Sequence, residues 1–513
     1  MKHIRIIKNA VAMMMAFFVT ISCTDILDEP LENQIKVEDT DYTQSENMVL
    51  MLYGAYGELY RSQWETYTIL SVRGDDVTAA GDQFPLIETD EFRYDRNFWM
   101  YNSVWLNLYS DLLYWHGAME EIRKYQEGGA NPATAEQYRA EIKVMRSFEL
   151  LQLARTWGNI LIPTSSQPSE LFNVEVSTFE EVMNHISAQM DEAIPLLSDV
   201  HPRDRSDVRG GITRGAALAV KAMANLELKN FPAVAEATGQ IISSNQFALE
   251  PDYYELFKTP GKLNRENILE FQYSDFGTGT GTRTSYPFET YGPASWTPAV
   301  TGASTGWGFF APSAKYIKFM LNRGEQERLQ TTVLFTPAGL DEIKADPQFS
   351  TLPAWMSNVT PDGDVFNSHP RYNFLSGKHY LPSNQLIPGR FSYGSNKNFT
   401  AIRYSEVLLM HAEALVNGAS SSVLSADQAV NLVRQRVGLG TLSGVNLDVV
   451  LDEKYAEFGM EGGIRFYDLM RYEKASELNF EGRSFSIQNH KFLPYPLEQE
   501  NILPKLADYK ANN

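Results

Sequence analysis

The sequence predicts a mainly α-helical fold, in which a scaffold of tetratricopeptide-like helical hairpins is followed by an irregular, loop-rich second half. Apolar residues recur at helical spacing in a succession of segments before residue 265. Lys229–Pro232 separates two such segments, which gives a hairpin of tetratricopeptide length, although the full residue pattern of that repeat is missing. Residues 276–312 are rich in Gly, Thr and Pro and show no period, as is typical of loops.

The first half contains several amphipathic segments that we expect to be helices. Four of them are Asn47–Tyr60, Trp105–Lys124, Ala140–Trp157 and Ser177–Leu197. The third stops at Gly158, a residue type that commonly ends helices, and Ser177 with Glu180 matches a capping box for the fourth. Thr213 is expected to cap a further helix. Residues 71–85 contain too many Gly, Asp and Pro residues for a regular element.

The second half regains regular structure only in part. Residues Ile268–Ser274 have the composition of a short strand, whereas residues 346–397 are irregular. Ser425 and Gln428 match a capping box, which indicates a helix start. The helices expected in this half are Ile402–Asn417, Ala426–Val437 and Val449–Tyr472.

Residues 1–22 have the character of a signal peptide. Basic residues without any acid precede an apolar run at residues 10–21, which is shorter than the ~20 residues of a membrane-spanning helix. Cys23, the only cysteine of the chain, follows a small residue, so we expect it to be acylated and to anchor the protein to a membrane. Thr20 and Ile21 depart from the usual lipobox, and the alternative is a plain signal peptide with an incidental cysteine.

The chain after residue 22 is strongly acidic. It keeps all 64 Asp and Glu residues and all but three of the 44 Lys and Arg residues, which gives a formal charge of −23. Such a surface repels nucleic acid and anionic lipid headgroups, so we expect neither as a partner. A single cysteine allows no intramolecular disulfide, and stability must come from the core. No linker divides the chain, so we expect residues 23–265 and 266–513 to form one compact body.

Aromatic residues concentrate where the backbone is irregular. Residues 283–310 hold seven of them, although aromatics make up 12% of the chain, and residues 60–115 are similarly rich. Rings on Gly-rich loops lack helical packing partners, so some are expected to stack on flat apolar surfaces such as a sugar ring. The alternative for each ring is burial under a loop, and burial is the expected fate of the helical Trp105 and Trp115. Composition and loop context indicate these candidate ligand-binding residues: Trp296, Trp307, Tyr291, Trp99, Phe98, Arg73 and Asp75.

Signals for catalysis are weak. Gly302–Gly306 matches the nucleophile-elbow pattern, but no predicted strand precedes it and no helix directly follows. The eight histidines include no HExxH metal motif. Asp75–Asp76 is the nearest candidate for the carboxylate pair of a glycoside hydrolase, and a surface hydrolase is therefore kept as an alternative. We expect a protein that is not an enzyme, with no catalytic residue, no metal and no cofactor.

Several segments, in register over nearly the whole length of the chain, resemble the SusD/RagB family of surface lipoproteins. In the first half and its junction they are Cys23–Pro30, Ala140–Asn159, Arg214–Ala217, Tyr253–Phe257 and Glu266–Glu270. More specific are Arg403–Ala414, similar to the family's RYAEVLLMYAEA helix, Asn431–Gly438, similar to NxVRxRAG, Glu457–Leu469, similar to E…EGxRxxDL, and Leu493–Pro496, similar to LPIP. Lys454 departs from the usual arginine, and Gly463–Ile464 changes the spacing of the Glu-Gly-x-Arg motif.

The resemblance implies a right-handed scaffold of about four tetratricopeptide-like helix pairs with an irregular second half folded onto it. It also implies a nutrient-binding lipoprotein of the outer membrane that faces the cell exterior. Such a protein captures oligosaccharides and delivers them to a SusC-like TonB-dependent transporter. The motif residues would be structural, so Arg465 and Asp468 are expected to pair with buried groups, and specificity would lie in the loops. A peptide-binding member of the same family is the alternative.

Overall fold

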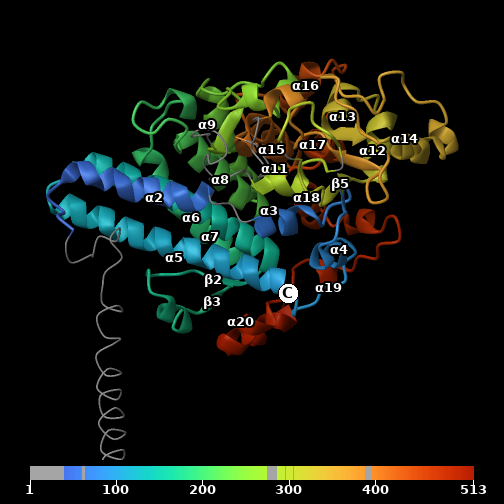
Figure 1. The fold of residues 1–513 in the computed structure, drawn as a ribbon. Coiled ribbons are helices and arrows are strands. Elements are labelled where there is room, and N and C mark those ends of the chain that lie inside the picture. Colours follow the sequence, from blue (N-terminus) through green and yellow to red (C-terminus); the bar gives the residue numbers. More distant parts are fainter. Residues whose placement is uncertain are drawn as a thin grey trace, which may run out of the picture.

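The computed structural model describes residues 40–60, 64–273, 286–294, 296–303, 305–386 and 396–512. The expected signal peptide, Cys23 and the serine at position 304 lie outside these residues. The described chain is mainly helical, with short two-stranded sheets between the helices (Figure 1). This architecture confirms the predicted fold class.

The long helices of the first half pack in the order of the chain. They are α2 (Met48–Tyr60), α5 (Trp99–Glu127), α6 (Pro132–Trp157), α7 (Phe179–Ala193), α8 (Arg214–Glu227) and α9 (Phe231–Ser243). From α5 onward each helix packs on the next, and α2 packs on α5 and α6, as Figure 1 shows. The pair α8 and α9 is the hairpin predicted from the break at Lys229–Pro232. In the sequence, the short helices α3 (Trp64–Ser71) and α4 (Phe84–Asp90) come between α2 and α5.

Two helix starts differ from the prediction. Thr178 and Glu181 form the capping box of α7, in place of Ser177 and Glu180. The frame is one residue later because Ser177 still belongs to a strand. Thr213 lies at the N-cap position of α8, but its hydroxyl makes no capping hydrogen bond.

Four antiparallel two-stranded sheets are present in the described residues. They pair β1 (Val77–Ala79) with β5 (Phe310–Pro312), β2 (Ile160–Leu161) with β3 (Val176–Ser177), β4 (Asn267–Phe271) with β8 (Phe399–Arg403), and β6 (Val333–Phe335) with β7 (Phe374–Ser376). β4 confirms the predicted strand at residues 268–271, whereas Gln272 and Tyr273 are not part of it. The β1–β5 and β4–β8 sheets join segments more than a hundred residues apart, so they hold the loop-rich half in place.

The second half contains α12 (Ala314–Asn322), α13 (Glu327–Thr332), α14 (Pro337–Lys344), α15 (Tyr404–Val416), α16 (Ala426–Arg436), α17 (Leu447–Phe458), α18 (Ile464–Arg471), α19 (Ile487–His490) and α20 (Leu497–Ile502). The predicted capping box of α16 is present. The expected loop at 276–312 also holds α11 (Tyr286–Tyr291) and β5, which the missing periodicity did not indicate.

The predicted helix Val449–Tyr472 is instead two helices, α17 and α18. Gly462 and Gly463 between them both have positive φ, the left-handed region that glycine enters at little cost. A Cβ atom at position 463 would lie 2.2 Å from the carbonyl oxygen of Leu70, so this position leaves no room for a side chain. The break therefore depends on a contact with α3 that lies far away in the sequence.

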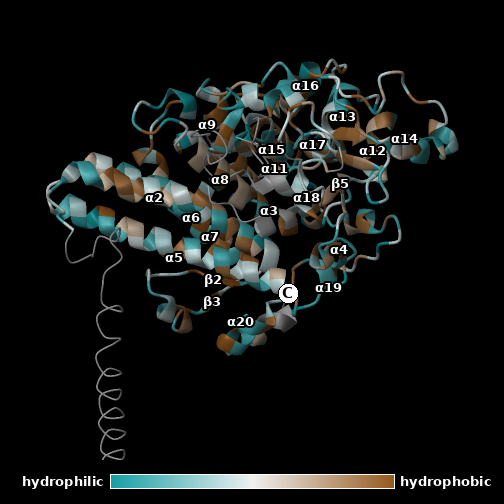
Figure 2. Ribbon diagram, in the orientation of Figure 1, coloured by the Kyte–Doolittle hydropathy of each residue, from teal (hydrophilic) through white to brown (hydrophobic). Residues whose placement is uncertain are grey.

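One large core extends through both halves of the chain. Trp115, Trp157 and Ala217 of the scaffold belong to the same buried cluster as Leu408 of α15 and Tyr495 near the C-terminal end. In Figure 2 hydrophobic residues are concentrated where the helices face one another, and the outer turns are mainly hydrophilic. The helical Trp105 and Trp115 are both buried, as predicted.

A network of buried ion pairs connects the elements of the second half. The guanidinium of Arg403, at the end of β8, contacts Glu266 at 2.5 Å, Glu457 at 2.8 Å and Glu461 at 2.9 Å. The side chains of Arg403, Glu266 and Glu457 are at most 2% exposed. Because buried charges are tolerated only when paired, the three carboxylates and the guanidinium depend on one another.

We expect Arg403→Met to lower the free energy of unfolding by about 3–5 kcal/mol, because it leaves Glu266 and Glu457 buried with fewer positive partners. Chemical denaturation followed by circular dichroism measures the change. The control is Arg93→Met, since Arg93 is 53% exposed and pairs with Glu88 at the surface; this change is expected to cost less than about 1 kcal/mol. Equal effects of the two substitutions would contradict the assignment.

Candidate functional site

Two of the predicted ligand-binding residues, Arg73 and Asp75, lie inside the protein with internal partners. The guanidinium of Arg73 lies 4.3 Å from the ring centre of Phe466. The carboxylate of Asp75 pairs with Arg465 at 2.9 Å and with Lys315 at 2.7 Å. Both side chains are fully buried, so the expectation that they border an exposed site is corrected. The Asp75–Arg465 pair instead confirms that Arg465 has a buried partner.

Tyr291 and Trp296 are also covered, although both lie in the stretch expected to be loop. Trp296 is 8% exposed, packs against Phe366 and Tyr380, and donates its indole N–H to the carbonyl of Pro293 at 3.1 Å. Tyr291 is 2% exposed and stacks on His379 with ring centres 4.4 Å apart. These two rings stabilise the loop-rich half and do not form an open platform.

Two of the remaining aromatic candidates, Phe98 and Trp99, are neighbours in the chain, and Phe98 contacts a ring that the sequence analysis did not select. Trp99, the first residue of α5, is 50% exposed, and Phe98 before it is partly buried. Phe84, at the start of α4, is 59% exposed and lies edge-to-face with Phe98 at 5.7 Å. Phe84, Phe98 and Trp99 are named here the aromatic platform. The sequence did contain a signal for Phe84. This residue belongs to the aromatic-rich residues 60–115 and lies near the end of the irregular stretch 71–85, directly before Pro85.

Backbone hydrogen bonds join the segment of Trp307 to the segment that precedes α4. The N–H of Ala80 donates to the carbonyl of Phe309 at 2.7 Å, which continues the β1–β5 ladder toward α4. Trp307 is partly buried and lies 5.2 Å from the Phe309 ring. Gly81 has positive φ, and a Cβ atom added at this position would lie 2.9 Å from the same ring. The ladder therefore joins the segment of Trp307 to the segment that carries Phe84.

Exposed polar side chains flank the aromatic platform. Asp95 accepts hydrogen bonds from the backbone N–H and the side-chain amide of Asn97, at 2.9 and 2.8 Å, which lower the pKa of Asp95. Gln83, next to Phe84, donates to Asp82 at 3.1 Å. Aromatic faces beside amide and carboxylate groups can bind a ligand that has apolar faces and hydroxyl edges.

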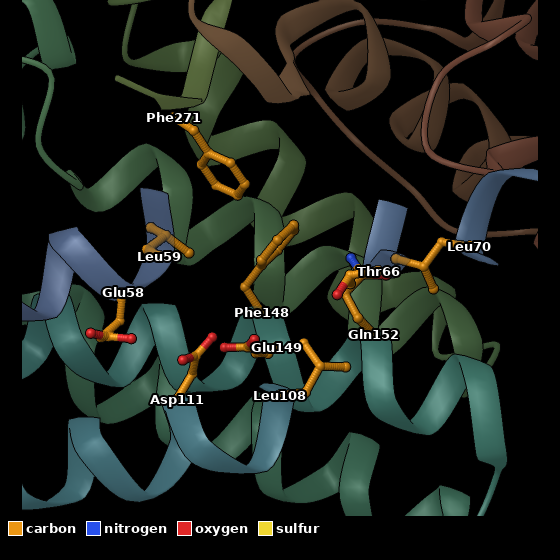
Figure 3. A pocket seen from close by; sticks show the side chains of 10 residues that line it. All are labelled: Glu58, Leu59, Thr66, Leu70, Leu108, Asp111, Phe148, Glu149, Gln152 and Phe271. Atoms are coloured by element: carbon orange, nitrogen blue, oxygen red, sulfur yellow. The ribbon is translucent and has the colours of Figure 1, made fainter. Parts of the chain in front are cut away.

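A pocket lies between α2, α3, α5 and α6, with about 410 Å³ of empty space that includes open solvent (Figure 3). Figure 3 shows Glu58, Asp111 and Glu149 on one side of it and the rings of Phe148 and Phe271 on another. Each of the three carboxylates already takes part in other interactions of the protein. The acidic group therefore gives no indication of a ligand.

The carboxylate pair considered for catalysis makes contacts that stabilise the fold. Asp76 accepts the N–H of Met460 at 2.8 Å and is buried beside Asp75. No group of three or more His, Cys, Asp or Glu residues in the described ranges is placed to hold a metal ion. The helices of the described chain include none that is both long and apolar enough to cross a membrane.

Comparison with known families places this architecture among proteins of one class. The model of the SusD family matches residues 265–492, and a second model, described as "Starch-binding associating with outer membrane", matches residues 27–226. Several solved neighbours are described by what they bind: one as a laminarin-binding SusD-like protein, one as a surface glycan-binding protein and one as a SusD-like carbohydrate-binding protein. The chain belongs to the SusD/RagB family.

Individual relatives agree over nearly the full length. A SusD-like protein of Bacteroides ovatus is 22% identical over 90% of this chain and 82% of its own. SusD-like protein P2 of Formosa agariphila is 22% identical over 98% of this chain and 100% of its own. The solved surface glycan-binding protein A of Bacteroides thetaiotaomicron, in complex with laminarihexaose, has a TM-score of 0.71 at 22% identity, covering 90% of this chain and 98% of that one.

We expect Asp76→Asn to reduce the dependence of stability on pH between about pH 5 and 8. Burial raises the pKa of Asp76 to about 7 in the folded state, above the value of about 4 in the unfolded chain. The folded state thus binds this proton more tightly, so the group's contribution to stability rises as the pH falls through 7 toward 5.

Urea denaturation across this pH range measures the effect of Asp76→Asn. Asp95→Asn is the control, because that carboxyl is exposed and its pKa is lowered. An unchanged pH profile in Asp76→Asn would show that Asp76 is not protonated in this range.

Proposed function

We propose that this chain is a non-enzymatic, cell-surface glycan-binding protein. The observation that carries the proposal is the aromatic platform, where Phe84 and Trp99 keep half or more of their surface exposed beside polar side chains. Large apolar rings exposed together on a soluble surface are typical of ligand-binding sites. The relatives support the proposal, because one solved neighbour is described as a laminarin-binding SusD-like protein and another is in complex with laminarihexaose.

Within this proposal, the residues that contact the glycan are Phe98, Trp99 and Phe84, with Trp307 at the neighbouring edge. Tyr291 and Trp296 act beneath the surface, where they hold the loop that carries Trp307. Stacking supplies the binding energy, and the exposed amides and carboxylates bind hydroxyl groups. Because no ion pair with the ligand is required, affinity should vary little with salt.

The protein is proposed to work at the outer membrane, anchored by an acylated Cys23 and facing the cell exterior. The family model named for association with the outer membrane supports this location. From there it would pass oligosaccharides to a SusC-like TonB-dependent transporter. The acidic charge of the chain favours a neutral glycan over an anionic one at this surface.

We expect Trp99→Ala and Phe84→Ala each to weaken glycan binding by about tenfold, because each removes one stacking face. Calorimetry of the chain from residue 24 onward against a panel of plant, microbial and host glycans measures the affinities. Phe172→Ala is the matched control, since this ring is 57% exposed on a different segment and should leave binding unchanged.

Each other outcome of this experiment has a defined meaning. Binding that survives both platform substitutions would move the site elsewhere. Release of shorter products would support the hydrolase alternative. If no glycan binds, the peptide-binding alternative becomes the better one.

We expect Cys23→Ser to move the protein from the membrane fraction to the soluble fraction of cells that carry out lipoprotein processing, because acyl chains need the thiol. Fractionation and immunoblotting measure the distribution, with Ser22→Ala as the control that keeps a small residue before the cysteine. A membrane-bound Cys23→Ser protein would support the plain signal peptide and another means of attachment.

A further inference from the structure

A chamber lies where the helical scaffold meets the second half of the chain, with about 670 Å³ of empty space that includes open solvent. The scaffold contributes Phe148, Gln152 and Arg155 of α6 and Met223 of α8. The second half contributes residues 399–403 of β8 and the start of α15.

The apolar part of the chamber is largely aromatic. Phe148 from the scaffold and Phe399 and Phe458 from the second half all line it. Because these rings come from three different elements, the chamber exists only in the folded chain. Phenyl faces of this kind bind flat apolar faces of a ligand.

Glu406, on α15, lines the chamber and is near cations, but it is in hydrogen-bond or ion-pair contact with none of them. Its side chain is 6% exposed, and no hydrogen bond or ion pair joins it to any other residue of the described ranges. Gln152, which lines the chamber from the opposite half, likewise uses its side-chain amide in no hydrogen bond within the described chain. A buried carboxyl without a partner is costly, so a ligand that bonds to it would be stabilised.

The cations beside Glu406 are already neutralised. Arg155 pairs with Glu227 at 2.8 Å, and Arg403 pairs with Glu266 and Glu457. An anion in the chamber would meet Glu406 and Glu461, whereas a cation would lie beside Arg155 and Arg403. The balance therefore favours a neutral ligand with several hydroxyl groups. Burial raises the pKa of Glu406 to about 7, so this carboxyl can either accept or donate near neutral pH.

We propose that this chamber is a second, internal binding site for a neutral sugar of one or two rings, held by Glu406 and Gln152 between the phenyl faces. The class of ligand rests on the proposed glycan-binding function, whereas the unpartnered carboxyl and the aromatic lining belong to the chamber itself. The chamber is separate from the aromatic platform, with no lining residue in common.

The test uses the chain from residue 24 onward with Phe84→Ala and Trp99→Ala, which removes the platform. Calorimetry measures binding of glucose, galactose, mannose, xylose, N-acetylglucosamine, maltose, cellobiose and laminaribiose at millimolar concentration. We expect at least one of these sugars to bind. Glu406→Gln in this background should weaken it about tenfold, because a charge-assisted hydrogen bond is lost without a change of shape.

A second variant fills the chamber. Ala401 lines it, so Ala401→Phe should abolish binding of the same sugar, and Ala133→Phe at an exposed position of α6 should not. Circular dichroism checks folding, and Glu406→Gln decides the question if Ala401→Phe does not fold. The proposal is overturned if none of the sugars binds the background, or if Glu406→Gln binds as tightly as the background does.

The result of the chamber experiment can be separated from the result of the experiment on the aromatic platform. The platform is tested by polysaccharide binding of the otherwise unchanged chain, with and without Trp99, and the chamber by small sugars in its absence. Either site can therefore fail without deciding the other.

Discussion

The second half of the molecule depends on the buried ion pairs of the Glu457 carboxylate. This carboxylate receives Arg403 from β8, Arg436 from α16 and Arg328 from α13, and all of these side chains are buried. Burial alone would raise the pKa of Glu457, but the charges of Arg436, Arg403 and Arg328 outweigh it and hold the pKa below its ordinary value. Short elements with little core of their own are thereby fixed to one another.

A second group of ion pairs joins this half to the scaffold. Glu227 at the end of α8 binds Arg155 of α6 at 2.8 Å and Arg471 of α18 at 2.9 Å. Asp468 in turn binds Arg471 at 2.7 Å and Lys454 at 2.6 Å. The pairing of Asp468 agrees with the expectation from its motif. Lys454, which stands where the family usually has an arginine, forms its ion pair with Asp468 through a single ammonium group. The relative position of the two halves, and with it the chamber between them, follows from these contacts.

Burial divides the aromatic residues of the loop-rich segments into two roles. Rings such as Trp296 and Tyr291 cover one another and take the place of a regular sheet or helix as the support of the loops. Phe84 and Trp99 lie where an irregular segment turns into a helix, and each keeps half or more of its surface exposed. The same composition therefore supplies both the packing of the loops and a surface able to stack on a ligand.

The sequence by itself determined most of the helices, because amphipathic periodicity and caps such as Ser425 with Gln428 act within a few residues. It also indicated the family and the aromatic-rich segments, of which Phe98 and Trp99 remain candidates at the surface. It did not show that Arg73 and Asp75 are buried, since their partners on α18 lie almost 400 residues later in the chain.

Only the tertiary structure decided which rings are exposed and where a cavity exists. Trp296 is covered by Phe366 and Tyr380, and the chamber is lined by phenyl rings from α6, β8 and α17. Exposure and cavity shape depend on contacts between distant segments, whereas helix propensity is a local property. For that reason the residue types that can bind a sugar were readable from the sequence, but their division between surface, chamber and core was not.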